Sequence, residues 1–163
     1  MLDKLTQKMI EYFSGDPKRI QHFIKVHSFA ALIGRMEGLD EREQFTLEAA
    51  ALVHDIGIKP AETLFGESGG RLQEQLGPAQ AEAMLKELQF PDDVTERVCY
   101  MVSKHHTYSD ISGKDLQILI EADFIVNLYE DGVSANGIRS VYESIFATKS
   151  GKEICRNVFG IED

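Results

Sequence analysis

The stretch Leu52-Val53-His54-Asp55-Ile56-Gly57 places a histidine and an aspartate side by side at the end of an apolar segment. Phe45 and Ala49 precede it at helical spacing, so the segment predicts a helix with one face toward a core. We expect Gly57 to end this helix in the left-handed conformation, which glycine adopts at little cost. A buried helix end is a costly place for an unpaired charge, and a divalent metal would resolve that cost. The doublet therefore predicts a metal site only if other ligands converge on it.

The composition is typical of a one-domain globular protein. A chain of 163 residues matches the usual size of a single domain. No apolar run approaches the roughly 20 residues of a membrane span, and residues 1–5 do not resemble a secretory signal. Cys99 and Cys155 are too few for a disulfide framework and lack metal-site spacing. We expect a cytoplasmic protein that does not bind membranes.

The formal net charge of −10 excludes one class of function. Proteins that grip nucleic acid through their general surface need concentrated lysine and arginine, so we expect no such binding. A small phosphorylated substrate remains compatible, because one or two divalent cations in a cleft reverse the local field. The oligomeric state is not specified by any pattern in the chain.

The whole chain has helical patterns that are interrupted by glycine and proline, and it lacks the alternation typical of strands. This pattern predicts an all-α fold of about six to eight helices. Asp16-Pro17 is a strong helix start, and Asp40 with Glu43 has the pattern of a capping box. The expected helices cover residues 2–13, 17–37, 40–56, 78–88, 92–106, 115–128 and 138–146.

The remaining segments carry weaker patterns. Residues 58–76 lack clear periodicity, and we expect a long flexible connection there that covers a site. Gly77-Pro78 is expected to open a short helix. The tail from residue 150 has apolar residues for docking on the domain or on a neighbour, namely Ile154, Val158 and Phe159.

Asp123 is the second anchor for a metal site. Its helix is apolar almost all round, which predicts burial, except for a narrow stripe through Asp123, Asn127 and Glu130. A buried carboxylate needs an arginine, hydrogen-bond donors or a metal as its partner.

The five histidines all lie on expected helices or at their ends: His22, His27, His54, His105 and His106. On the shared helix of His22 and His27, either ring can face inward. One such ring, His54-Asp55 and Asp123 would supply two neutral imidazoles and two carboxylates, which balance a divalent cation. Mixed nitrogen and oxygen ligands suit Mn, Fe, Co, Ni or Zn better than Ca, and the lack of cysteine ligands argues against a closed structural zinc site. The competing interpretation is a helical protein whose histidines only fill the core, which predicts no bound metal.

The first-histidine segment, Arg19-Ile20-Gln21-His22-Phe23-Ile24-Lys25-Val26, resembles a motif of the HD-domain superfamily of metal-dependent phosphohydrolases. Ala30 and Gly34, eight and twelve positions beyond His22, are also similar to that family's pattern. The resemblance runs over residues 19–130, with residues 131–163 as a C-terminal helix and tail of the same single domain. It implies an all-helical fold and favours His22 over His27.

The resemblance also implies a ligand set. The metal ligands would be His22, His54, Asp55 and Asp123, and the pair His105-His106 matches the histidines that hold a second metal in some members. Two departures stand out. Those members have a histidine or acidic residue just before a Gly-Pro, where this chain has Leu76, with Glu74 nearby. The family's frequent lysine after the Ile-Gly of the doublet is displaced to Lys59.

These observations lead to a functional hypothesis. We expect hydrolysis of a phosphate ester, of a nucleotide or another small metabolite, by a metal-activated water with Asp55 in the catalytic centre. Lys59, Lys104 or Arg19 would neutralise phosphate oxygens. The alternative is a metal-containing regulatory module that senses a nucleotide without turnover, an interpretation motivated by Leu76.

Overall fold

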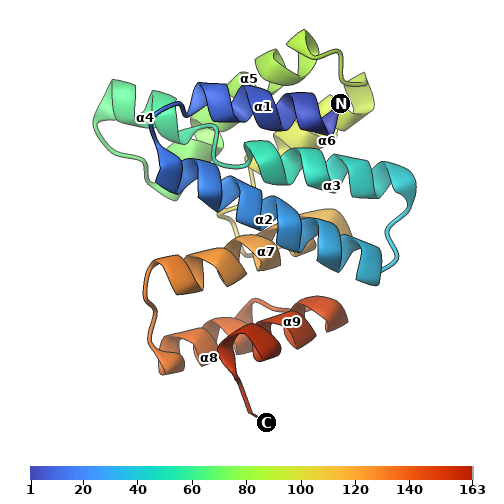
Figure 1. The fold of residues 1–163 in the computed structure, drawn as a ribbon, viewed down its shortest axis with the longest axis vertical. Helices are drawn as coiled ribbons and strands as arrows, with labels where there is room; N and C mark the ends of the chain where they lie inside the picture. Colours follow the sequence, from blue (N-terminus) through green and yellow to red (C-terminus); the bar gives the residue numbers. More distant parts are fainter. Residues whose placement is uncertain (163) are drawn as a thin grey trace.

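The structure, a computed structural model, describes residues 1–162, and this part of the chain forms nine α-helices without a strand (Figure 1). The all-α prediction is therefore confirmed. The helices are α1 (Leu2–Tyr12), α2 (Pro17–Met36), α3 (Glu41–Val53), α4 (Ile58–Phe65), α5 (Gly70–Glu87), α6 (Asp92–Val102), α7 (Lys114–Glu130), α8 (Ala135–Ser144) and α9 (Lys149–Phe159).

Three helices form the centre of the molecule. α2 packs against both α3 and α7, and α3 also contacts α1, α6 and α7. α5 pairs with α6 and α4 leans on α5, while α8 and α9 form a separate layer along α7 (Figure 1). The largest fully buried side chains, drawn from α1, α2, α3, α5, α6, α7 and the turn after α3, are Leu5, Met9, Phe23, Ile33, Leu47, Leu52, Ile56, Leu85, Met101, Leu116, Ile118 and Leu119.

Two predicted helix starts are confirmed by their caps. The Asp16 side chain accepts a hydrogen bond from the backbone N–H of Arg19 at 3.1 Å, one turn into α2. Asp40 and Glu43 satisfy each other's backbone N–H groups at the start of α3, at 2.8 and 3.1 Å. Such caps satisfy donors that the helix itself cannot pair.

The expected flexible connection over residues 58–76 is wrong. α4 begins immediately after the His-Asp turn, and α5 begins at Gly70, so Gly77-Pro78 lies inside α5 instead of opening a helix. The sequence signal was weak because α4 is only 8 residues long and buries just Ile58 and Ala61. Tertiary packing against α5, and not periodicity, stabilises this short helix.

Gly57 has a different role from the one expected. Its φ of −71° is right-handed, and it begins α4 instead of ending α3 in the left-handed conformation. A Cβ at this position would lie 2.6 Å from the Gln73 carbonyl oxygen and 2.9 Å from the Gly77 nitrogen. Glycine is required here because the backbones of α4 and α5 approach each other closely.

The C-terminal layer is fastened to α7 by a buried carboxylate. Glu121 accepts hydrogen bonds from the backbone N–H groups of Ala147 and Thr148 at 2.7 and 2.9 Å. Cys155 of α9 is buried, whereas Val158, expected to dock, is 47% exposed. Within residues 1–162, every helix is too short or too polar to cross a membrane.

Candidate metal centre

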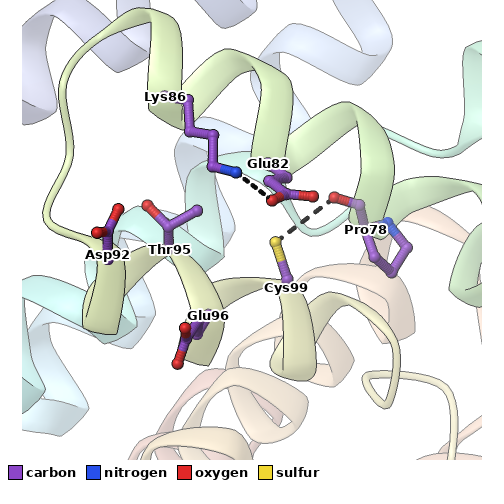
Figure 2. A pocket seen from close by; sticks show the side chains of 7 residues that line it. All are labelled: Pro78, Glu82, Lys86, Asp92, Thr95, Glu96 and Cys99. Carbon is purple, nitrogen blue, oxygen red and sulfur yellow. Dashed lines mark hydrogen bonds and ion pairs between the residues drawn. The ribbon is translucent and has the colours of Figure 1, made fainter.

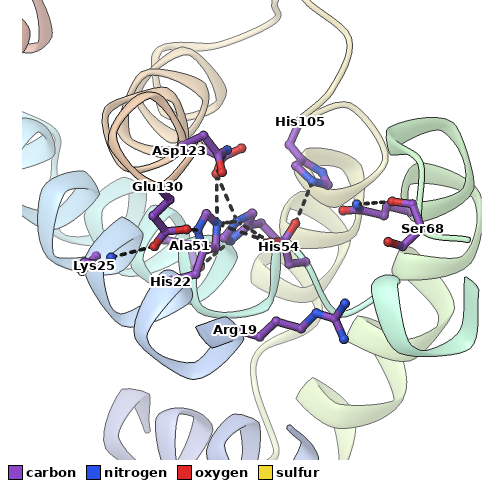
Figure 3. Close-up of polar contacts among 12 residues, drawn as sticks. Arg19, His22, Lys25, Ala51, His54, Ser68, His105, Asp123 and Glu130 are labelled. Atoms are coloured by element: carbon purple, nitrogen blue, oxygen red, sulfur yellow. Dashed lines mark hydrogen bonds and ion pairs between the residues drawn. The ribbon is translucent and has the colours of Figure 1, made fainter. Parts of the chain in front are cut away.

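Four side chains from three central helices and one turn converge on a single point. His22 lies on α2, His54 caps the C-terminal end of α3, Asp55 follows in the next turn, and Asp123 lies on α7. Figure 3 shows the rings of His22 and His54 together, with the carboxylate of Asp123 directed at them. The predicted set is therefore brought together by the packing of α2 between α3 and α7.

The atoms that meet are all potential metal ligands. His22 Nε2 lies 3.3 Å from His54 Nε2, 3.3 Å from Asp55 Oδ2 and 3.2 Å from Asp123 Oδ1. His54 Nε2 lies 3.4 and 3.5 Å from the same two carboxylate oxygens. His54 is fully buried and Asp123 is 5% exposed.

Contacts behind the cluster fix the orientation of both rings. His54 Nδ1 donates to the Ala51 carbonyl at 2.7 Å, and His22 Nδ1 donates to Glu130 Oε2 at 3.0 Å. With the proton on Nδ1, a neutral imidazole carries its lone pair on Nε2. Two lone pairs and two carboxylate oxygens therefore face one another in a buried space. Only a cation or shared protons can relieve that repulsion, so the donor set fits a divalent metal.

The polar stripe on α7 supports this arrangement. Asn127 donates to Asp123 Oδ1 at 2.8 Å, and Lys25 Nζ lies 2.6 Å from the second oxygen of Glu130. The relay Lys25–Glu130–His22 is visible in Figure 3. The sequence placed Glu130 on the stripe but did not reveal its contact with His22.

The electrostatics agree with a site built for positive charge. Burial disfavours the charged form of His54, but the Asp55 charge and hydrogen bonds with Asp123 and Asp55 raise its pKa well above the ordinary value. Burial likewise opposes ionisation of Asp55, yet the charge of His54 holds its pKa well below the usual range. Against burial, the hydrogen bond with Asp123 raises the pKa of His22. In the absence of metal, protons take the place of the cation.

A second group of potential ligands adjoins the first. Asp55, His105 and His106 have ligand atoms within 4.8 Å of one another. His105 Nδ1 donates to the Val102 carbonyl at 2.8 Å, and its buried Nε2 lies 3.6 Å from Asp55 Oδ1 without a hydrogen-bond partner in residues 1–162. Asp55 thus faces both groups, one through each oxygen. The structure brings together the residues of the predicted second metal position, but its two histidines have different surroundings.

The alternative ligand His27 lies outside the cluster. Its Nε2 lies 3.1 Å from Oε2 of Glu48, a residue of α3 that precedes the His54-Asp55 doublet. The His27 ring therefore faces α3, but at a position away from the doublet. The choice of His22 is therefore supported by the geometry. Because α2 is buried against α3 and α7, its apolar pattern alone did not distinguish the two histidines.

The three cations expected near the phosphate lie in different places. Lys59 donates to the Tyr12 carbonyl at 2.8 Å and lies over the Tyr12 ring, which ties α4 to α1. Lys104 lines a separate hollow beside Thr107. Within residues 1–162, neither ammonium has a hydrogen bond or ion pair with the cluster, and their role toward phosphate stays a prediction. Arg19, by contrast, borders the cluster.

A cleft of about 210 Å³ leads to the ligands. Its lining combines cations, acids and two members of the cluster: Asp16, Lys18, Arg19, His22, Asp55, Ile58 and Glu130. Among these lining residues, Arg19 pairs with Glu62 and lies 3.1 Å from Asp16. Lys18 had no signal in the sequence, since a single lysine at a helix start is common.

A wider hollow, of about 530 Å³, lies between α5 and α6 and is shown in Figure 2. It contains the Glu82–Lys86 ion pair and Cys99, whose thiol donates to the Pro78 carbonyl at 3.5 Å. Burial raises the pKa of Cys99, which makes it a poor nucleophile. This hollow lacks the converging ligands of the metal centre.

Comparison with known proteins agrees with the geometry. The family model for the HD domain matches residues 19–134. The chain belongs to the HD-domain family. HD domains bind divalent metals and are typically hydrolases, and His22, His54, Asp55 and Asp123 all lie within the matched range.

A solved structure shares the HD fold over nearly the whole chain. It is described as a predicted HD superfamily hydrolase from an uncultured Thermotogales bacterium. The TM-score is 0.71 at 23% identity, and the match covers 98% of this chain and 85% of the other. At that identity the likeness shows the fold alone. No curated protein matches this HD domain.

Proposed function

We propose that this HD domain is a metal-dependent phosphohydrolase that cleaves a phosphate ester of a nucleotide or another small metabolite. The observation that carries the proposal is the meeting of two imidazole Nε2 atoms and two carboxylate oxygens at 3.2 to 3.5 Å, where Asn127 donates to the Asp123 oxygen alone. Acceptor atoms that face one another in this way are not expected in a protein core, where buried polar atoms pair with donors. This arrangement supports metal binding over the interpretation that the histidines only fill space.

The ion would be held by His22, His54, Asp55 and Asp123, and Mn, Fe, Co, Ni and Zn all suit these ligands. When bound, a divalent cation lowers the pKa of water toward about 7 and polarises a phosphoryl oxygen. This is the chemistry that phosphate-ester hydrolysis requires.

The chain's own residues would orient the substrate. Lys18 and Arg19 lie on the first turn of α2, at the edge of the cleft, where they can pair with phosphate oxygens. Glu62 pairs with the Arg19 guanidinium, so an arriving phosphate has to compete with this carboxylate. Asp55 remains ionised because its pKa is depressed, so it can hold a cation without first losing a proton.

Hydrolysis of p-nitrophenyl phosphate, followed at 405 nm in the presence of Mn²⁺, Co²⁺ or Ni²⁺, tests the proposal. We expect Asp55→Ala to reduce activity to background while the circular dichroism spectrum is kept. Asp93→Ala is the matched control, since Asp93 is an exposed carboxylate paired with Arg42. Undiminished hydrolysis by the Asp55 variant would refute the assignment.

The alternative of a regulatory module that senses a nucleotide is kept because one structural feature favours it. The neutral side chain of Gln73 contacts His106, where a second metal would need a charged or basic ligand. Nucleotides that raise the melting temperature without phosphate release, across the same metals, would support the sensing role. Phosphate release would support the enzymatic interpretation.

A cytoplasmic location is likewise our proposal, and it rests on the two free cysteines.

A further inference from the structure

His106 differs from the other three histidines of the two groups because its Nε2 faces an amide oxygen, whereas theirs face carboxylates. Its Nε2 lies 3.1 Å from Gln73 Oε1, and its Nδ1 lies 3.4 Å from the Tyr108 hydroxyl. Gly70 fits against the same ring, since a Cβ there would lie 2.8 Å from His106 Cγ. The start of α5 thus encloses His106, whereas the Nε2 of His105 stays unpartnered.

The orientation of the Gln73 amide follows from its other contact. Gln73 Nε2 donates to the Ser68 carbonyl at 2.8 Å, so Oε1 must be the atom that faces His106. A carbonyl oxygen only accepts, and His106 Nε2 therefore carries the proton. That nitrogen cannot ligate a metal until its proton moves or the amide turns away.

The charge of the two positions is also unequal. Asp55 and Asp123 balance one divalent ion, but a second ion at Asp55, His105 and His106 would share Asp55 and add no further free carboxylate. Glu74, the nearest acid on α5, accepts from the His106 backbone N–H and the Thr107 hydroxyl at 2.9 Å each. Two ions would leave the buried centre with an uncompensated charge of about +2, which is costly in low dielectric.

We propose that this chain loads its two metal positions unequally, with Gln73 as the residue that keeps the second position weak until a phosphate oxyanion supplies the missing negative charge. The inference rests on the proposed function for the choice of phosphate as the anion. It assigns the second ion to the substrate-bound state and the first ion to the resting protein.

The test is a titration of metal-free protein with Mn²⁺ by calorimetry and electron paramagnetic resonance, with and without inorganic phosphate. We expect one tight Mn²⁺ per chain without phosphate, a second ion about tenfold or more weaker, and two coupled ions when phosphate is present. Gln73→Glu supplies the negative charge and should hold two coupled ions without phosphate. Gln73→His, a second variant, should strengthen the second ion if the glutamate variant fails to fold.

Gln75→Glu is the matched control, because Gln75 is exposed on the same helix and carries the same change of charge. It should bind one Mn²⁺ tightly, like the parent chain. Two equally tight ions in the parent protein without phosphate, or a second ion unaffected by both phosphate and the Gln73 variants, would overturn the inference alone. No Mn²⁺ bound in any variant would overturn the proposed function as well, and hydrolysis is scored separately.

Discussion

Glu130→Gln isolates the contribution of the carboxylate behind His22. The Glu130 carboxylate accepts from His22 Nδ1 at 3.0 Å and is itself neutralised by Lys25 at 2.6 Å. Although burial opposes its ionisation, the hydrogen bonds with Lys25 and His22 lower the pKa of Glu130, so the carboxylate is charged near neutral pH. The amide keeps the shape but can present its N–H₂ to His22, which misorients the ring and makes its Nε2 less basic.

The expected loss follows from the behaviour of such outer carboxylates. Their removal weakens metal affinity by about 10- to 100-fold. Free Mn²⁺ at 100 times the parent Kd stabilises the parent chain by about 2.7 kcal/mol, and the same concentration stabilises the variant by about 0.4 to 1.4 kcal/mol. For a chain of this size the metal-induced rise in Tm should shrink by about 3 to 9 °C.

The assay is differential scanning calorimetry of metal-free protein with and without Mn²⁺, together with a direct titration of the Kd. Glu48→Gln is the matched control, because Glu48 of α3 pairs at 3.1 Å with His27, which lies on α2 like His22 but outside the cluster. Its Kd should equal that of the parent chain. An unchanged Kd in Glu130→Gln, or an equal loss in Glu48→Gln, would refute the idea that Glu130 acts through His22.

Four further predictions probe the site and the fold. Mn²⁺ binding should release protons near neutral pH and should weaken as the pH falls, because the raised pKa of His54 keeps its ring protonated in the metal-free protein. Calorimetry in buffers of different ionisation enthalpy measures this proton release. A binding enthalpy that does not depend on the buffer would contradict it. For the same reason the stabilisation from protonated His54 in metal-free protein is fully present below about pH 6.5 and is lost as the pH rises through the folded-state pKa, which urea unfolding across pH detects. Gly57→Ala should lower the free energy of unfolding by about 1 to 3 kcal/mol, since its Cβ meets the backbone of α5, and Gly57→Val should be worse. Phe23→Ala should cost about 3 to 5 kcal/mol in urea unfolding, because the ring follows His22 on α2 and is fully buried, and a cost under 1 kcal/mol would show that the site collapses around the gap.

Local signals allowed the sequence to predict the helices that carry the ligands. Asp16-Pro17 and the Asp40–Glu43 box mark helix starts through contacts within one turn, so no tertiary information is needed. The HD family pattern then selected His22, a choice that periodicity left open because α2 is buried on two sides.

Features that depend on distant contacts escaped prediction. Gly57 was expected to end α3 in the left-handed conformation, which is wrong; glycine is needed there because of the backbone of α5, 16 and 20 residues away at Gln73 and Gly77. α4 is too short to show a period, and the Gln73–His106 contact joins residues 33 positions apart. No window of a single sequence shows such contacts, because they arise from how helices dock.

The order of the ligands along the chain has a consequence for biosynthesis. His22 and His54 are 32 residues apart, and Asp123 follows only after α3 to α6 have been made. Domains generally fold as units, the N-terminal ones first during synthesis. A nascent chain that ends before α7 offers His22, His54 and Asp55 without the last carboxylate, so the complete site is assembled only when α7 docks against α2 and α3.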